Sequence, residues 1–216
     1  MSMHQRLAVI VPPVLIVSMY ATFQWLTRAF GFPLGYLAAF IVYWIGWCGV
    51  VPAVLIGRRH LIELFTRRPA FRTLDLPTRL LLLWPIVFPL VFAFIPRVQS
   101  AGAPVILISI ALGVVIGITE EALWRGVYVT LFDGNARLAV IYPSIGFAVW
   151  HVCPLSVLPS RYPGGTVSFA VYSLALGLSY ANCARRTRSI FWCTASHCVH
   201  DALGLGGFAY VGLLQR

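Results

Sequence analysis

Long apolar runs separated by short polar segments dominate this chain of 216 residues. A helix needs about 20 consecutive apolar residues to cross a bilayer. The runs that reach or approach this length are Leu7 to Leu26, Leu34 to Ile56, Leu80 to Ile95, Pro104 to Phe132, Leu138 to Leu158, Thr166 to Ala184 and Ser189 to Leu214. Glycines at Gly204, Gly206 and Gly207 can divide the last run in two. We therefore predict an all-α transmembrane helix bundle with seven or eight spans, forming one membrane domain over residues 1–216.

The composition agrees with this pattern. Hydrophobic residues make up 60% of the chain, charged residues only 10%, and the mean hydropathy is +0.86, whereas about a quarter of the residues in soluble proteins are charged. The first apolar run contains Pro12 and Pro13, is too long for the core of a signal peptide and lacks a clear cleavage site. We expect it to remain in the mature protein as the first span.

The basic residues indicate an orientation. All sixteen are arginines, and they give a formal net charge of +10. The densest group lies between the second and third runs, at Arg58, Arg59, Arg67, Arg68, Arg72 and Arg79. A nucleic-acid site is one interpretation, but the arginines flank hydrophobic spans, which favours the excess of positive charge on cytoplasmic loops. This places the N-terminus inside, leaves Arg28, Arg97 and Arg161 outside, and gives no reason to expect a nucleic-acid partner.

A pair of adjacent carboxylates is the clearest polar feature within an apolar run. Glu120 and Glu121 end the stretch that begins at Pro104, and a charge at bilayer depth costs about 3 kcal/mol unless it is paired. Glu121 and Arg125 are four residues apart, so they share a helix face and can form an ion pair. Glu120 lies about 100° around the helix and is free for another partner. A structural ion pair and a catalytic carboxylate are both compatible with this segment.

Two further runs carry histidine. His151 ends the segment Phe147-Ala-Val-Trp-His151, and His197 and Asp201 lie four apart in the last run, on one helix face. Each of these on its own is as compatible with a satisfied hydrogen bond as with catalysis. His200 lies off the face shared by His197 and Asp201, and we interpret it as a packing residue.

Taken together, Glu120, His151 and His197 are of the residue types that bind a divalent metal or activate a water molecule. A desolvated carboxylate is a competent general base near neutral pH, and an imidazole can hold water or stabilise an oxyanion. Hydrolysis is the natural reaction for such a set. The chain has no HExxH, GxSxG or GxGD motif, so zincin-like, serine and presenilin-like proteolysis have no motif support.

The order of these motifs resembles a known family. EExxxR at Glu120 to Arg125, FxxxH at Phe147 to His151 and HxxxD at His197 to Asp201 resemble the CPBP group, which includes CAAX prenyl proteases and bacteriocin-processing or immunity (Abi) proteins. The resemblance covers about 104–205. The segment from Arg186 to Ile190 resembles the family's Arg-Thr-Gly-Ser-Ile, with Arg188 in place of the glycine, and Asp201 stands where asparagine is common.

The resemblance implies an intramembrane endopeptidase similar to type II CAAX prenyl endopeptidases. It implies Glu120 as the base that activates water, Glu121 and Arg125 as its support, and Asp201 as the residue that completes the site. His151 and His197 would hold the water, the oxyanion or a metal. A divalent metal such as zinc, bound by Glu120, His151 and His197, and a metal-free water are both compatible with these residues. The implied substrate is a membrane-associated peptide or protein, lipidated in some relatives.

Two other functions stay open at this stage. The fold can serve as a non-catalytic bacteriocin-immunity or scaffold protein, with the polar groups used in assembly. Buried Glu, His and Asp side chains can also form a proton relay. The absence of lysine and the abundance of Ala, Gly and Val are typical of GC-rich bacterial genomes, which favours a bacterial cytoplasmic membrane as the location.

Overall fold

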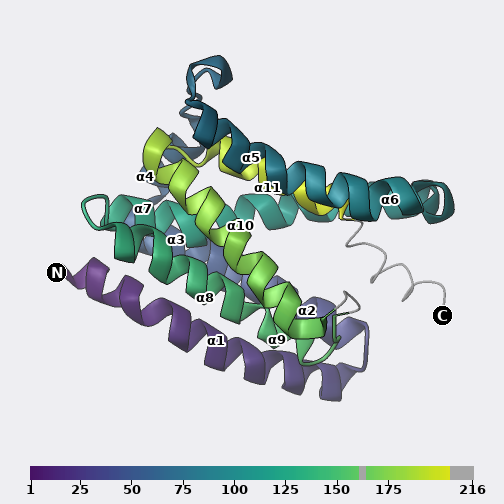
Figure 1. The fold of residues 1–216 in the computed structure, drawn as a ribbon. Coiled ribbons are helices and arrows are strands. Elements are labelled where there is room, and N and C mark those ends of the chain that lie inside the picture. Colours follow the sequence, from purple (N-terminus) through teal and green to yellow (C-terminus); the bar gives the residue numbers. More distant parts are fainter. Residues whose placement is uncertain (161–163, 205–216) are drawn as a thin grey trace.

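The computed structural model describes residues 1–160 and 164–204, and these are helical apart from short connections, with no β-strand among them (Figure 1). The elements are α1 (Met3–Phe30), α2 (Leu34–Val42), η1 (Tyr43–Val50), α3 (Val51–Ile56), α4 (Arg58–Thr66), η2 (Phe71–Thr73), α5 (Leu76–Pro89), η3 (Leu90–Phe94), α6 (Ile95–Glu121), η4 (Ala122–Val127), α7 (Tyr128–Leu131), η5 (Arg137–Ile141), α8 (Tyr142–Trp150), α9 (Val152–Leu155), α10 (Gly165–Thr187) and α11 (Phe191–Leu203). The predicted all-α class is confirmed.

The predicted number of spans is not confirmed. Among the described residues, five continuous helical runs are long and apolar enough to cross a membrane: Met3–Phe30, Leu34–Ile56, Leu76–Leu131, Arg137–Leu155 and Gly165–Thr187. The third run covers two predicted spans. The last predicted span is represented by α11, whose 13 residues are too few to cross a bilayer, and Gly206, Gly207 and the rest of 205–216 lie outside the described residues.

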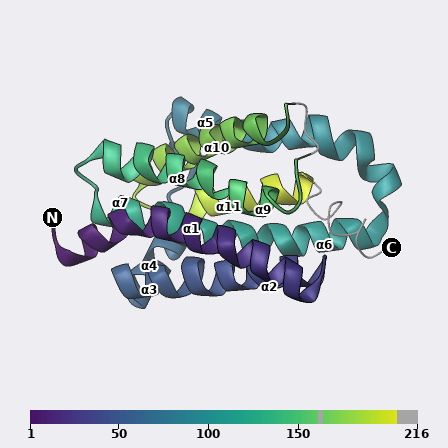
Figure 2. The same cartoon turned by 90° about the horizontal axis from the view of Figure 1, so that it is seen from below.

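A glycine divides the longest run. Gly102 has φ 72° and ψ 163°, a conformation that side chains with a Cβ rarely adopt. The chain changes direction at this kink. The first part of α6 lies at one end of the molecule, and its longer second part runs back along the bundle (Figure 2). The prediction of separate apolar segments before and after residues 96–103 therefore agrees with the kink in the backbone at Gly102.

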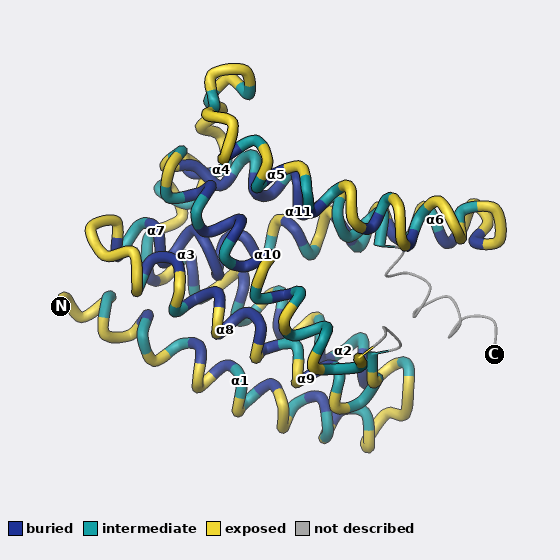
Figure 3. Tube along the Cα trace, viewed as in Figure 1, coloured by how far each residue is buried: buried dark blue, intermediate teal, exposed yellow. Residues whose placement is uncertain are grey.

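Two groups of helices make up the bundle. Helix α11 packs mainly against α6 and α5, while α10 packs on α8, and α1 packs on α2 and α8. The α5, α6 and α11 group extends beyond the rest of the bundle in Figure 1. The most deeply buried segments cluster where α3, α7, α8 and α10 meet, as the dark blue parts of the trace show (Figure 3). The candidate site residues come from helices of both groups.

Tyrosine hydroxyls compensate for the two prolines inside α1. Because proline has no N–H, Pro12 and Pro13 leave the carbonyls of Ala8 and Val9 without their helical donors. The Tyr128 hydroxyl donates to Ala8 O at 2.9 Å, and the Tyr142 hydroxyl donates to Val9 O. In a bilayer no water is available for this purpose, so neighbouring helices must supply the donors.

His200 also supplies a donor to a carbonyl that a proline leaves without its helical partner. Pro89 leaves the Pro85 carbonyl in α5 without a helical donor, and His200 Nδ1 lies 2.7 Å from that oxygen. The His200 ring also stacks on Tyr172, with centroids 5.7 Å apart. His200 therefore joins α11 to α5 and α10, which agrees with its interpretation as a packing residue.

The unusual Arg188 has a clear conformational role. It follows α10 with φ 50° and ψ 36°, the left-handed region in which glycine is most easily accommodated. A glycine, which the motif resembled by this segment has at this position, would adopt this conformation without strain. The Arg188 guanidinium lies 3.0 Å from Asp133 Oδ2, a contact that a glycine does not provide.

Candidate active site

Close contact between α6 and α11 forms the base of the site. A Cβ at Gly117 would lie 2.8 Å from the backbone nitrogen of Cys198, and one at Gly113 would lie 2.6 Å from the Cys198 carbonyl oxygen. Real Cβ atoms do not approach backbone so closely, so these two positions require glycine. Small residues four apart allow helix backbones in membranes to approach. This approach brings His197 of α11 to the end of α6, where the two glutamates lie.

The two adjacent glutamates have different partners, as their angular separation predicts. Glu121 Oε1 lies 3.0 Å from Arg125 Nη1 and 2.8 Å from His197 Nδ1. Glu120 Oε2 lies 3.7 Å from His197 Nε2. Glu120 and Glu121 are 4% and 0% exposed. Glu121 is therefore the carboxylate occupied by structural partners, and Glu120 is the less engaged one.

The contact with Glu121 determines the proton position on His197. A carboxylate accepts hydrogen bonds and does not donate them, so Nδ1 carries the proton that it donates to Glu121. Nε2 then faces Glu120 and also Asp201, whose Oδ2 lies 3.5 Å away. His197 is 2% exposed. The His197 imidazole thus lies between the Glu121 carboxylate on its Nδ1 side and the carboxylates of Glu120 and Asp201 on its Nε2 side.

Arg125 lies between aromatic rings. Its guanidinium carbon is 4.5 Å from the ring centre of Phe147 and 5.3 Å from that of Tyr180. The Arg125 N–H groups are not aligned for a hydrogen bond to Glu121, although the nitrogen lies at ion-pair distance. Because Arg125 is only 1% exposed, the faces of the two rings supply part of the stabilisation of the cation.

The local backbone at Arg125 departs from the α-helix. The segment η4, which starts immediately after Glu121, is π-helical, and all six of its residues are buried. Single π-helical turns inside α-helices occur frequently at functional sites. The spacing of four residues still places Arg125 next to Glu121, as the sequence predicted.

His151 lies at the end of α8 and joins the other residues through Phe147. Its Nδ1 is 2.7 Å from the Phe147 carbonyl oxygen, so this nitrogen donates and Nε2 is left as an acceptor. The Phe147 ring lies 4.7 Å from the His151 ring and 6.1 Å from the His197 ring. Within the part of the chain that the structure describes, no polar contact joins His151 to either glutamate.

The structure therefore brings five of the six predicted residues into one cluster of ion-pair contacts. The ring of Phe147 lies between His151 and this cluster. The five are Glu120, Glu121, Arg125, His197 and Asp201. These contacts establish where the side chains lie. Their assignment as catalytic residues remains a prediction.

The predicted metal ligands do not form a ligand set in this structure. Among residues 1–160 and 164–204, no three His, Cys, Asp or Glu side chains are arranged to hold a metal ion. Glu120, His151 and His197 therefore do not fit around a common cation here, and we derive no reaction step through one. The predicted metal remains a question for experiment.

Tyr180 is a site residue that the sequence did not reveal. It is 0% exposed, and its ring stacks on His197 with centroids 5.3 Å apart and an angle of 29° between the planes. The Ser196 hydroxyl, which donates to Leu82 O, also lies 3.3 Å from the Tyr180 hydroxyl. Tyr180 stands in an apolar run that carries none of the recognised motifs, and the only available signal is an aromatic residue with a polar atom in a predicted span.

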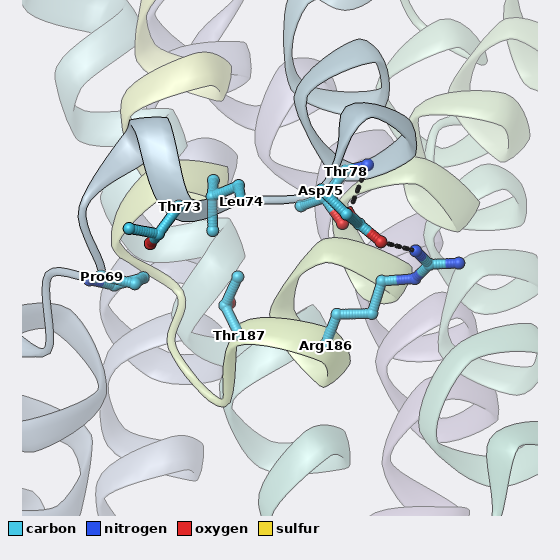
Figure 4. Close-up of a pocket in the computed structure, with 7 residues that line it drawn as sticks. All are labelled: Pro69, Thr73, Leu74, Asp75, Thr78, Arg186 and Thr187. Carbon is cyan, nitrogen blue, oxygen red and sulfur yellow. Dashed lines mark hydrogen bonds and ion pairs between the residues drawn. The ribbon is translucent and has the colours of Figure 1, made fainter.

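A surface pocket of about 360 Å³ lies elsewhere, between the start of α5 and the end of α10 (Figure 4). Asp75 and Arg186 form an ion pair of 2.8 Å in its wall. Hydrogen bonds from the Thr78 hydroxyl and backbone, and then the Arg186 guanidinium, lower the pKa of Asp75 below its ordinary value. None of the predicted site residues lines this pocket, so it is separate from the candidate active site.

Comparison with known proteins supports the family suggested by the motifs. Residues 102–203, just under half of the chain, match the family model described as type II CAAX prenyl endopeptidase Rce1-like. No curated protein and no solved structure matches the chain. The matched segment contains all three motifs and ends with α11. The apolar helical runs and this match together indicate an integral membrane protein. Residues 102–203 are therefore similar to the type II CAAX prenyl endopeptidase Rce1-like family.

Proposed function

We propose that this protein is an intramembrane endopeptidase in which Glu120 activates the water that attacks a peptide carbonyl. The single observation that carries the proposal is the division of labour between the adjacent glutamates. Glu121 is held by Arg125 and His197, while Glu120, equally buried, faces only the Nε2 side of His197 among these polar groups. Packing alone requires one carboxylate for Arg125, and a second one in the same dry environment needs another purpose.

The proposed reaction requires two proton transfers. Glu120 takes a proton from water as the water oxygen attacks the carbonyl carbon, and it gives a proton to the amide nitrogen as the C–N bond breaks. His151, with its proton on Nδ1, can orient the water by accepting a hydrogen bond at Nε2. His197 in its protonated form can donate from Nε2 to the oxyanion, supported by Asp201. In both histidines Nδ1 is engaged by a neighbouring residue, and the proposed reaction uses Nε2.

The substrate we propose is a membrane-associated peptide, because the site lies within a bundle of apolar helices and the matched family is described as type II CAAX prenyl endopeptidase Rce1-like. The scissile bond must reach Glu120 near the end of α6. A lipid anchor on the peptide would hold it at the bilayer and raise its local concentration. A prenylated CAAX-type reporter and the same peptide without the lipid therefore form the natural pair of substrates.

The deciding experiment measures cleavage of both reporters by the purified protein and by Glu120→Gln. We expect a loss of at least about 100-fold in kcat, because glutamine keeps the shape but cannot accept the proton. Glu63→Gln is the matched control, since the Glu63 side chain is half exposed in α4 and pairs only with surface residues. Activity of Glu120→Gln equal to that of the wild type would contradict the mechanism and would favour the scaffold or immunity function.

A chelator arm tests the predicted metal separately. The same assay is run after treatment with a strong zinc chelator and after re-addition of zinc. Unchanged cleavage after chelation indicates a reaction carried by the side chains alone. Cleavage that is lost and then restored by zinc shows that the side chains rearrange around a cation, which the present arrangement of Glu120, His151 and His197 does not provide.

A further inference from the structure

Arginines from two distant segments of the chain meet at one end of the bundle. The first segment, residues 67–75, connects α4 to α5, and the second, residues 186–192, joins α10 to α11. Their exposed arginines, which we call the arginine patch, are Arg67, Arg68, Arg72, Arg186 and Arg188. The first three are close together in the sequence, whereas only the fold adds the other two.

Contacts between the two segments hold the patch together. Arg67 Nη1 donates a hydrogen bond of 3.2 Å to the Arg188 carbonyl oxygen, and the Ser189 hydroxyl donates to the Arg67 carbonyl oxygen. The guanidinium carbon of Arg68 lies 4.7 Å from the ring centre of Phe191. The arginines of both segments therefore belong to one surface that tertiary contacts define.

Carboxylates neutralise only part of the charge of the patch. Arg186 pairs with Asp75 at 2.8 Å, and Arg188 pairs with Asp133 at 3.0 Å. The other three arginines of the patch form no ion pair with any residue that the structure describes. Their guanidinium groups are donors with no acceptor function of their own. The patch therefore keeps an excess of positive charge that suits an anionic ligand.

The patch lies where two membrane spans begin and end. The apolar run Leu76–Leu131 starts beside it, and the run Gly165–Thr187 ends within it. The rings of Phe71 and Trp192 are 5.2 Å apart here, and Trp192 Nε1 donates to the Pro69 carbonyl oxygen at 2.8 Å. Tryptophan is enriched at the boundary between a membrane and water. At this boundary the most abundant anions are the phosphates of lipid headgroups.

The surface pocket of about 360 Å³ opens within the patch (Figure 4). Arg186 lines it, and two other lining residues, Pro69 and Thr73, are chain neighbours of Arg68 and Arg72. A guanidinium group is planar and can hold a phosphate through two parallel hydrogen bonds. The patch thus combines positive charge with a recess that can hold a small polar group.

An apolar groove follows on the next turns of the same helix. A cavity of about 690 Å³ lies along α5, and its lining residues are Pro77, Leu80, Leu81, Leu83, Trp84 and Val87. Asp75, which lines the polar pocket, lies only two residues before Pro77. Free phosphate matches only the polar pocket, whereas a molecule with a phosphate and hydrocarbon chains matches both cavities.

We propose that the arginine patch and the groove along α5 form a binding site for an anionic phospholipid. The arginines hold the lipid phosphate, the pocket takes the rest of the headgroup, and an acyl chain lies in the groove. Clusters of basic residues next to membrane spans attract anionic lipids in this way. The site is separate from Glu120 and its partners, and it lies largely in the part of the chain that precedes residues 102–203.

The test measures binding of short-chain phosphatidylglycerol to the purified protein in a neutral detergent, without any peptide substrate. The comparison ligands are phosphatidylcholine with the same acyl chains and inorganic phosphate. We expect phosphatidylglycerol to bind at least about tenfold more tightly than either, because its net charge meets arginines that have no ion pair. Added salt should weaken this preference, since ions screen exposed charges.

A charge-removing variant locates the site. In Arg67→Gln/Arg68→Gln/Arg72→Gln we expect the affinity for phosphatidylglycerol to fall at least about tenfold, with phosphatidylcholine binding unchanged. The matched control removes the same formal charge from exposed arginines in α1 and α6, by Arg6→Gln, Arg28→Gln and Arg97→Gln. This control should bind like the wild type. Where the triple variant does not fold, Arg72→Gln alone serves instead, and we expect a loss of about twofold or more.

The outcomes are distinct from those that test the proposed function. Equal affinity of the patch variant and the control variant for phosphatidylglycerol overturns the lipid site. Inorganic phosphate or a DNA oligonucleotide that binds as tightly as phosphatidylglycerol also overturns it, because neither ligand has an acyl chain for the groove. Since no substrate is present, none of these results bears on Glu120. The activity of Glu120→Gln, in turn, does not bear on the lipid site.

Discussion

Ion pairs of the same chemistry occur in two very different parts of this protein. The exposed pairs are Arg59–Glu63, Arg186–Asp75 and Arg188–Asp133. All three lie near the arginine-rich ends of α4, α5, α7 and α10, where the side chains are about half exposed or more. The pair Arg125–Glu121, between α6, α8 and α11, has side chains that are 1% and 0% exposed. Only the buried pair, Arg125–Glu121, belongs to the candidate active site.

The difference teaches which arginines the fold depends on. Water and salt screen an exposed pair, which contributes about 0–1 kcal/mol. A buried pair must overcome the cost of removing both charges from water, and it is stable only when every charge has partners. Arg125 has Glu121 at ion-pair distance and the rings of Phe147 and Tyr180 beside its guanidinium. We therefore expect replacement of these surface arginines to be tolerated better than replacement of Arg125.

The largest expected effect is that of Arg125→Met. It leaves Glu121 buried with His197 as its remaining partner, and we expect the free energy of unfolding to fall by about 3–5 kcal/mol. Thermal unfolding in detergent is the measurement, with Arg59→Met as the control for an exposed pair. We expect the control to change stability by less than about 1 kcal/mol. Equal effects of the two variants would show that burial does not distinguish the pairs.

A smaller effect is expected from Gly117→Ala, which tests whether close helix contact forms the buried site. The added Cβ meets the Cys198 backbone and forces α6 and α11 apart, at a cost of about 1–3 kcal/mol. Because the contact of His197 with Glu121 depends on this approach, cleavage should fall as well. Gly46→Ala is the matched control, since a Cβ there meets nothing within 4 Å. Unchanged melting of Gly117→Ala would contradict the close approach.

The smallest effect is expected at the exposed pair of Asp75 and Arg186. Hydrogen bonds from Thr78 and then the charge of Arg186 lower the pKa of Asp75 in the folded protein. A lowered pKa contributes stability above the unfolded value of about 3.9, and this contribution disappears as the pH falls through the folded value. Asp75→Asn should therefore melt slightly below the wild type at pH 7. The difference should vanish in acid, and a difference that grows in acid would contradict the sign.

Helical periodicity predicted much of the local arrangement. Pairs four residues apart lie together because a helix turns once in 3.6 residues, and both Glu121 with Arg125 and His197 with Asp201 are found in contact. The lengths of the apolar runs similarly predicted the helices themselves. The number of spans was harder to predict, because a single glycine conformation at Gly102 bends a run that remains helical on both sides.

Contacts between distant segments were out of reach of the sequence. Nothing in the spacing of Pro12 and Pro13 indicates that Tyr128 and Tyr142 would satisfy the carbonyls they expose. In the sequence, Tyr180 has the pattern of an ordinary member of an apolar span. It became a candidate site residue only when helix packing placed its ring against His197.

The sequence alone determined that the chain is helical and apolar, and that carboxylates, histidines and an arginine lie within its spans, because helix period and burial cost act over a few residues. The tertiary structure decided how the glutamates divide their partners. It did so through the Gly113 and Gly117 contact with α11, which brings His197 to Glu121 and leaves Glu120 on the other side of the imidazole. Such a division depends on how closely two backbones approach, and that distance is set by packing across the whole bundle rather than by local spacing.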